Sequence, residues 1–81
     1  MFQASITSTE NDRNITGPER KTPKRAINAV VDMAIQEGHN KHTRIALNED
    51  GSLVMTAHGN NPEKARQEAH DMLTRIRRRY R

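Results

Sequence analysis

The chain has no cysteine and no tryptophan, and Phe2 and Tyr80 are the only aromatic residues among its 81. Without cysteine there is no disulfide, no thiolate nucleophile and no thiolate metal ligand, which fits a reducing compartment. Because aromatic side chains bury the largest apolar areas, Ile, Leu, Val, Met and Ala must build the core. With a mean hydropathy of −1.02, we expect a thin core and a marginally stable monomer.

Long apolar runs are also missing, and so are the usual catalytic patterns. No stretch approaches the ~18 apolar residues of a membrane span, and the first residues lack the cationic and apolar segments of a secretory signal. There is no glycine-rich phosphate loop, and no Ser-His-Asp or paired-carboxylate site can be assembled from the spacing. We therefore expect a cytoplasmic protein that does not bind membranes. We also expect that it is not an enzyme and that it needs no cofactor.

Positive charge is present in excess, and it is confined to one segment. Residues 1–21 and residues 22–61 each hold equal numbers of acidic and basic side chains. Residues 62–81 hold seven Lys or Arg against three Asp or Glu, a net +4 that equals the net charge of the whole chain. Such a local excess favours a polyanionic or acidic partner.

Residues 1–21 are polar, and they show no sustained periodicity before a turn signal at Gly17-Pro18. We predict that they form a flexible polar arm, because chain termini are often untethered. Residues 22–81 would then form a single α-β-β-α domain. In the alternative, Phe2 and Ile6 dock on this domain.

The segment between Thr22 and Gly38 has the features of an amphipathic helix. Thr22 can accept a hydrogen bond from an exposed backbone N–H, and Pro23 suits the first helical position. Apolar residues then recur at three- and four-residue spacing, at Ile27, Val30, Val31, Ala34 and Ile35, with Ala26, Ala29 and Met33 widening the stripe. We predict that this stripe faces the core and that the helix ends at Gly38.

Residues 43–57 have the pattern of a β-hairpin around Asp50-Gly51, a dipeptide suited to the positive φ of a tight turn. Alternation predicts that Ile45 and Leu47 share one face with Leu53 and Met55 of the next strand, and leaves Val54 on the outer face. A two-stranded ribbon is marginal by itself. It therefore needs two helices on one face, or a second subunit paired at its open edge.

The last segment is predicted to be a helix that begins with Asn61 as its cap and Pro62 in its first turn. Glu63 complements the positive end of the helix dipole. A narrow apolar stripe runs along the helix, formed by Ala65, Ala69, Met72, Leu73, Ile76 and Tyr80. The predicted fold class is thus α+β, a small two-layer arrangement with two helices on one face of an antiparallel hairpin.

The two flanks of this apolar stripe differ in how their charges are balanced. At about 100° per residue, one flank holds Arg66, His70, Arg77 and Arg81, and the other holds Lys64, Glu68, Asp71, Arg75 and Arg79. On the second flank, acids and bases four residues apart can pair. On the first, only Arg66 has an acid nearby, Glu63, so the other arginines remain uncompensated, and Arg78 joins them from the outermost face.

From Arg66 to Arg81 such a stripe would span roughly 22 Å at 1.5 Å per residue, enough to meet several phosphates. We therefore predict a small nucleic-acid-associated protein, binding RNA or DNA without catalysis. The phosphate-binding residues would be Arg66, Arg77, Arg78 and Arg81, with Lys41 and Arg44 as auxiliary cations. No aromatic residue interleaves the arginines except Tyr80, so phosphate contact rather than base stacking is expected.

Other interpretations of the same residues remain open. The runner-up is a protein-interaction module or small inhibitor, of the phage accessory kind, whose basic face docks on an acidic protein surface. Arginines near a helix C-terminus can also simply oppose the dipole and keep a small protein soluble. His39, His42 and His58 could converge on a metal, but we expect none, because cysteine is absent and the carboxylates lie elsewhere.

The segment TRIALNEDGSLVMTAHGNNPEKAR, residues 43–66, is similar to the closing strand, acidic-Gly turn, strand and helix of KH domains of the polynucleotide phosphorylase type. The similarity covers about 34 residues, to Ile76. It implies binding of single-stranded RNA and a two-layer α/β shape. A KH domain clamps the nucleic-acid backbone with a GXXG loop between two helices. Residues 38–41 contain a single glycine, so no clamping residue is carried over.

Overall fold

The computed structural model describes residues 1–8 and 13–79, with side chains described as far as Ile76. Its elements follow in the order β1 (Phe2–Ser8), β2 (Arg13–Thr16), α1 (Pro23–Gln36), β3 (Thr43–Glu49), β4 (Ser52–Gly59) and α2 (Pro62–Arg79). The strands form one four-stranded antiparallel sheet in the order β2-β1-β3-β4. The predicted α+β class is therefore confirmed.

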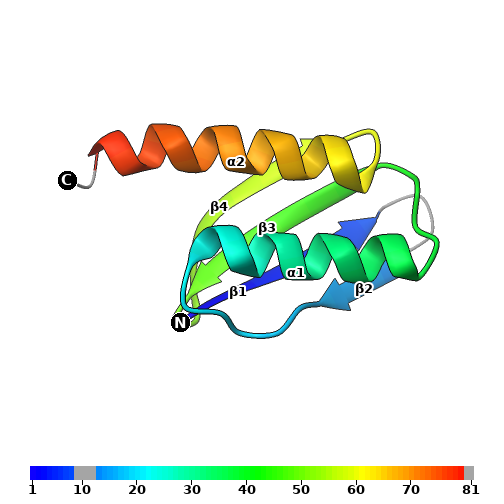
Figure 1. Cartoon of the computed structure of the whole chain (residues 1–81), viewed down its shortest axis with the longest axis horizontal. Coiled ribbons are helices and arrows are strands. Elements are labelled where there is room, and N and C mark those ends of the chain that lie inside the picture. The colour runs from blue at the N-terminus through cyan, green and yellow to red at the C-terminus, as the bar shows by residue number, and fades with distance from the viewer. Residues whose placement is uncertain (9–12, 80–81) are drawn as a thin grey trace.

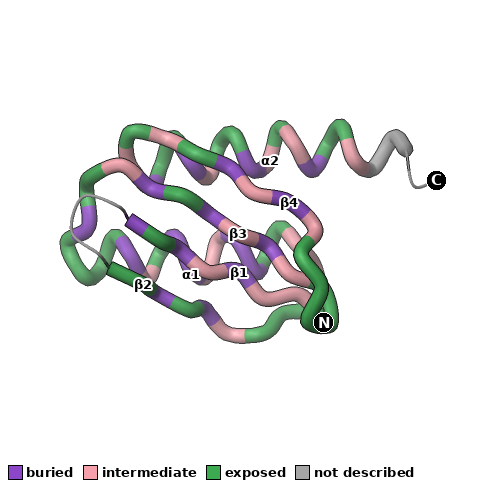
Figure 2. Tube along the Cα trace, turned by 180° about the vertical axis from the view of Figure 1, so that it is seen from behind, coloured by how far each residue is buried: buried purple, intermediate pink, exposed green. Residues whose placement is uncertain are grey.

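Both helices lie on the same face of the sheet, as predicted (Figure 1). Helix α1 packs mainly on β1, α2 packs mainly on β4, and the two helices also touch each other. Seen from behind, the sheet lies in front of both helices, and no described element covers its other face (Figure 2). The core lies between these two layers, where fifteen apolar side chains form one cluster of buried residues. Among the described helices, none has the length and apolar character needed to cross a membrane.

The prediction of a flexible arm at residues 1–21 is wrong for the residues that the structure describes. Strand β1 lies in the middle of the sheet between β2 and β3, and its side chains Ala4 and Ile6 are almost completely buried. Phe2 packs against the same core, so the alternative of docking on the body is the correct one. Residues 9–12 of the predicted arm lie outside the described residues.

The predicted hairpin is present as β3 and β4, and its turn has the expected conformation. Asp50 and Gly51 have φ values of 50° and 87°, as a two-residue turn of this type requires. The predicted face is wrong for Leu53, because the register shifts between Leu47 and Asn48. This bulge adds one residue to β4 and breaks the alternation, so Val54 packs on the core and Leu53 is exposed.

The predicted helix starts are confirmed by their caps. Thr22 Oγ1 accepts a hydrogen bond from the backbone N–H of Arg25 at 3.2 Å. Asn61 Oδ1 accepts one from the N–H of Lys64 at 2.9 Å. Helix α1 ends at Gln36, and Gly38 follows with a φ of 80°, a conformation that glycine adopts without a steric penalty.

The chain consists of two similar halves, each a hairpin followed by a helix. Strands β1 and β3, the first of each half, pair at the centre of the sheet, with Ile6 opposite Ile45. Gly17 and Gly59 have equivalent positions in the two halves, because the backbone of each packs closely against the helix of its own half. A Cβ added to Gly17 would lie 2.9 Å from Cβ of Val30, and one added to Gly59 would lie 2.2 Å from a backbone nitrogen of α2. Neither position has room for a side chain.

Candidate nucleic-acid interface

The fold places Lys41 and Arg44 at the opposite end of the molecule from the last described turns of α2. Helix α2 follows β4 and runs back along it, so its first turn lies at the end where β3 begins (Figure 1). Lys41 and Arg44 belong to that end. The arginine-rich last turns of α2 lie at the other end of a molecule whose longest extent is 38 Å. Lys41 and Arg44 therefore do not form one continuous surface with the last described turns of α2.

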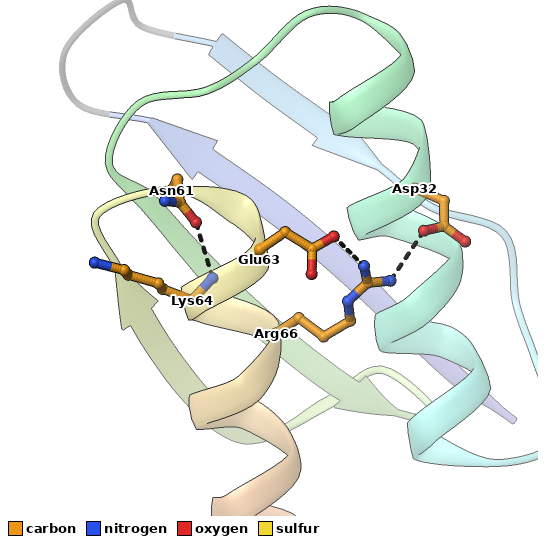
Figure 3. A network of polar contacts seen from close by, with 5 residues as sticks. All are labelled: Asp32, Asn61, Glu63, Lys64 and Arg66. Atoms are coloured by element: carbon orange, nitrogen blue, oxygen red, sulfur yellow. Dashed lines mark hydrogen bonds and ion pairs between the residues drawn. The ribbon is translucent and has the colours of Figure 1, made fainter.

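Arg66 is engaged in contacts between the helices and is not a free cation. Its guanidinium donates to Asp32 Oδ1 of α1 at 2.9 Å and also binds Glu63 of its own helix (Figure 3). Its side chain is only 21% exposed. Because both nearby carboxylates already bind it, Arg66 links α1 to α2, and a phosphate would have to compete with these two acids.

Among the remaining predicted arginines, Arg77 and Arg78 lie on the helical backbone of the last turns of α2. The helix continues to Arg79, and Figure 1 shows its C-terminal part extending beyond the sheet. The side chains of Arg77 and Arg78, and all of Arg81, lie outside the described part of the structure. Arg75, the last arginine with a described side chain, is exposed.

The ion pairs expected on the second flank of α2, between residues four apart, are not formed among the described side chains. Among the described side chains, no ion pair within 4.0 Å joins Asp71 to Arg75 or Lys64 to Glu68. Glu68 Oε2 instead accepts a hydrogen bond from the backbone N–H of His58 at 2.9 Å. Since β4 is an edge strand, this contact satisfies a backbone group that the sheet leaves open. The positive charge of Arg75 is thus not cancelled by a direct partner in the described residues.

At the opposite end, Arg44 is exposed on β3, paired across the sheet with Thr7 on one side and His58 on the other. Lys41 is exposed in the loop just before this strand. The rings of His42 and His58 lie close by, with their centroids 5.9 Å apart. These residues form a second, smaller group of basic side chains.

His39 has a structural role. It is 5% exposed, and its Nε2 lies 3.0 Å from Thr43 Oγ1. Because Thr43 Oγ1 donates its own proton to the carbonyl of Lys41 at 2.9 Å, it accepts from His39, which fixes the proton of the neutral ring on Nε2. No group of three or more potential metal ligands occurs among the described residues, so the converging-histidine hypothesis gains no support there.

His70 of α2 lies near Lys24 of α1. By sequence it was placed on the same helical flank as Arg66 and was assigned no role. Burial lowers its pKa below the ordinary value of 6.5, and the positive charges of Lys24 and Arg66 lower it further, while Asp71 acts in the opposite direction. Its Nε2 is buried without a hydrogen-bond partner among the described residues. The contact with Lys24 of α1 depends on the tertiary fold, which the flank position did not reveal.

A shallow groove beside the arginine-rich end was missed by the sequence analysis. It has a volume of about 520 Å³ and is lined by Phe2, Pro23, Glu49, Ser52, Leu53, Val54, Leu73 and Ile76. We call its six apolar residues the hydrophobic end: Phe2, Pro23, Leu53, Val54, Leu73 and Ile76. The one signal in the sequence was the run Leu53-Val54-Met55, because strict alternation would place a polar residue between two apolar ones.

Comparison of the chain with protein-family models, with curated proteins and with solved structures gave no match. The resemblance of residues 43–76 to part of a KH domain therefore stays a prediction.

Proposed function

We propose that this is a small, non-enzymatic nucleic-acid-binding protein whose C-terminal helix turns contact the phosphate backbone. The observation that carries the proposal is the extension of α2 beyond the sheet, at the end where the net positive charge of the sequence is concentrated (Figure 1). A cationic helix end that projects from a small body can approach a polyanion without steric conflict from the rest of the fold. We expect Arg77, Arg78 and Arg81 to supply the principal contacts.

The spacing of the arginines between Arg75 and Arg79, which include Arg77 and Arg78, suits phosphate contact. From Arg75 to Arg79 the helix rises roughly 6 Å at 1.5 Å per residue, which matches one to two phosphate steps along a DNA strand. Contacts of this kind position a protein on nucleic acid without reading bases. We therefore propose binding with little sequence preference, to RNA or DNA.

Arg66 is left out of the proposed interface, because Asp32 and Glu63 already bind it. Lys41 and Arg44 lie at the opposite end of the molecule, so they would not share a short stretch of nucleic acid with the last turns of α2. The proposed contact set is therefore smaller than the one expected from the helical flank.

The salt dependence of binding to duplex DNA tests this proposal. With about three phosphate contacts, a plot of log affinity against log salt should have a slope near −2.7, because each contact contributes about −0.9. The double variant Arg77→Ala/Arg78→Ala removes two contacts, so the slope should become shallower by about 1.8. Fluorescence anisotropy with labelled duplexes and with single-stranded RNA measures both quantities.

A matched control is available at the other end of the molecule. Lys41→Ala/Arg44→Ala removes the same number of positive charges, and we expect its slope to stay at the wild-type value. If both double variants reduce the slope equally, only overall charge matters and the proposed site is wrong. If no nucleic acid binds at low salt, and a single acidic protein co-purifies in stoichiometric amount after nuclease treatment, the runner-up function of docking on an acidic protein surface takes its place.

A further inference from the structure

We infer that a small hollow between the first turn of α1 and the middle of α2 is a binding site for one phosphate group or a similar tetrahedral oxyanion. The hollow is lined by Lys24 of α1 and by His70, Leu73 and Thr74 of α2. Leu73, which is shared with the hydrophobic end, is the one apolar residue of this lining. The site is separate from the last turns of α2, and the inference does not depend on the proposed nucleic-acid contacts.

The size of the hollow limits what can enter it. Its volume is about 80 Å³, whereas pockets for drug-sized ligands have roughly 300–1,000 Å³. A single water needs about 10–15 Å³ of such space, so the hollow holds several water-sized groups. A phosphate group therefore fits, but a nucleobase or a sugar does not fit beside it.

The charges around the hollow favour an anion. Lys24 is exposed, and no carboxylate lies within 4.0 Å of its ammonium group among the described residues. None of the described residues that line the hollow is acidic. The pKa of His70 is lowered first by burial and then by the positive charges of Lys24 and Arg66, which each act more strongly than Asp71 does in the opposite direction. The electrostatic potential at the imidazole is therefore positive, and a nearby anion would be stabilised.

The imidazole of His70 can supply a hydrogen-bond donor. Its Nε2 is buried without a partner, whereas its Nδ1 is not among the buried unpaired atoms of the described residues. A proton on Nε2 would have no acceptor, so the neutral ring is expected to carry its proton on the accessible Nδ1. The hydroxyl of Thr74 is already engaged, because it donates to the carbonyl of His70 at 3.1 Å. Lys24 and His70 are thus the two donors of the site.

A tetrahedral dianion suits this pair of donors better than a carboxylate does. It has enough oxygens to accept from both groups at once, and hydrogen bonds between charged partners are the strong ones. A bound anion also favours the imidazolium form of His70. By linkage, the anion should therefore raise the pKa of His70 and should bind more tightly as the pH falls.

NMR titration of the full-length protein tests the inference, with sodium sulfate and inorganic phosphate as probes and sodium chloride at equal ionic strength as the reference. The imidazole signals of His70 are assigned with the His70→Gln variant. We expect both oxyanions to shift these signals saturably. Sulfate, which stays a dianion throughout a pH titration, should also raise the pKa of His70. If His70 shows no saturable response beyond that to chloride, the inference is overturned.

A matched pair of lysine variants tests the position of the site. Lys24→Gln removes the ammonium group at the hollow and should raise the dissociation constant for sulfate at least about fivefold. Lys64→Gln removes the same charge on the other flank of α2, beside a different hollow, and should leave the constant unchanged. Both lysines are exposed, so the fold should persist, which circular dichroism checks. Equal effects of the two substitutions contradict the proposed site.

The source of the phosphate group is distinguished with the double variant Arg77→Ala/Arg78→Ala, which lacks two of the proposed nucleic-acid contacts. This variant should bind inorganic phosphate like the wild type, and a loss of that binding would place the anion at the last turns of α2 and overturn the inference. If a single-stranded oligonucleotide shifts the His70 signals of the wild type but not those of the double variant, a backbone phosphate occupies the hollow. If inorganic phosphate alone shifts them, the ligand is free phosphate, whatever the outcome of the DNA-binding test.

Discussion

At the scale of single residues, Arg66 and His70 are two residues of α2 that interact electrostatically with charged groups of α1. Arg66 binds one carboxylate from each helix, and His70 lies one turn further along α2, where Arg66 and Lys24 both disfavour its protonated form. The acids that hold Arg66 are more exposed than Arg66 itself, each with 63% of its side chain accessible. Solvent therefore screens the ion pairs, and their contribution to stability is modest.

Replacing Arg66 should affect stability more than nucleic-acid binding. We expect Arg66→Met, which keeps most of the aliphatic stem, to lower the free energy of unfolding by about 0.5–1 kcal/mol. The difference should shrink in high salt, because the lost interactions are electrostatic. Urea unfolding at two salt concentrations measures it. Arg25→Met, at an exposed arginine of α1 without an ion pair among the described residues, is the control and should be neutral.

His70 should make the fold less stable in mild acid. Its pKa in the folded state is below the ordinary value of 6.5, so below that pH the unfolded chain binds more protons than the folded one. Stability is therefore fully present above about pH 6.5 and is lost as the pH falls through the folded pKa. We expect His70→Gln to show a smaller loss of unfolding free energy between about pH 7.5 and about pH 5 than the wild type. Equal losses in urea unfolding would contradict this role.

At the scale of elements, β1 decides the architecture. It pairs with β2 on one side and with β3 on the other, so it joins the two halves of the chain. Its sequence FQASITS has only one large apolar side chain on the core side within the middle of the strand, Ile6. A polar segment thus forms a central strand because small residues and one isoleucine suffice to fill the space above it.

The importance of β1 can be measured with one substitution. Ile6 is 1% exposed and pairs with Ile15 and Ile45 in the sheet. We expect Ile6→Ala to lower the free energy of unfolding by about 2–4 kcal/mol, because it leaves a cavity in a thin core. Thr7→Ala, on the opposite face of the same strand, should cost much less. If urea unfolding shows Ile6→Ala to be neutral, residues 2–8 do not contribute to the folded core as described.

The sequence was informative wherever structure depends on neighbouring residues. Thr22-Pro23, Asn61-Pro62 and Asp50-Gly51 marked the helix starts and the hairpin turn correctly, because caps and tight turns are local interactions. The pairing of β1 with β3 joins segments about forty residues apart, and no local rule in this chain indicated it. The bulge beside Leu47 also depends on how β3 pairs with β4. It exposes Leu53 and turns Val54 toward the core, opposite to the faces predicted from alternation.

The candidate site was predicted only in part, for a related reason. A helical flank shows which residues share a face of α2, but it does not show what packs against that face. Asp32 of α1 lies 34 residues from Arg66 in sequence, so the ion pair that engages Arg66 follows only from the packing of the helices. The separation of Arg44 from the last turns of α2 likewise follows from the direction in which α2 runs along β4.

At the scale of the whole molecule, the two ends differ in chemistry. On one side of the molecule, the apolar groove lies beside the arginine-rich last turns of α2. The opposite side carries Lys41, His42, Arg44 and His58. The proposed phosphate contacts of the C-terminal helix turns belong to the first of these sides.

The two similar halves of the chain have a further consequence for the shape of the molecule. Because each half is a hairpin followed by a helix, the strands β1 and β3 hold the centre of the sheet while α2 can extend beyond it. Helix α1 has 14 residues, whereas α2 has 18 and belongs to the segment 62–81 that carries the net charge of the chain. The two halves thus share one order of elements and differ in the length and charge of the helix that completes each of them.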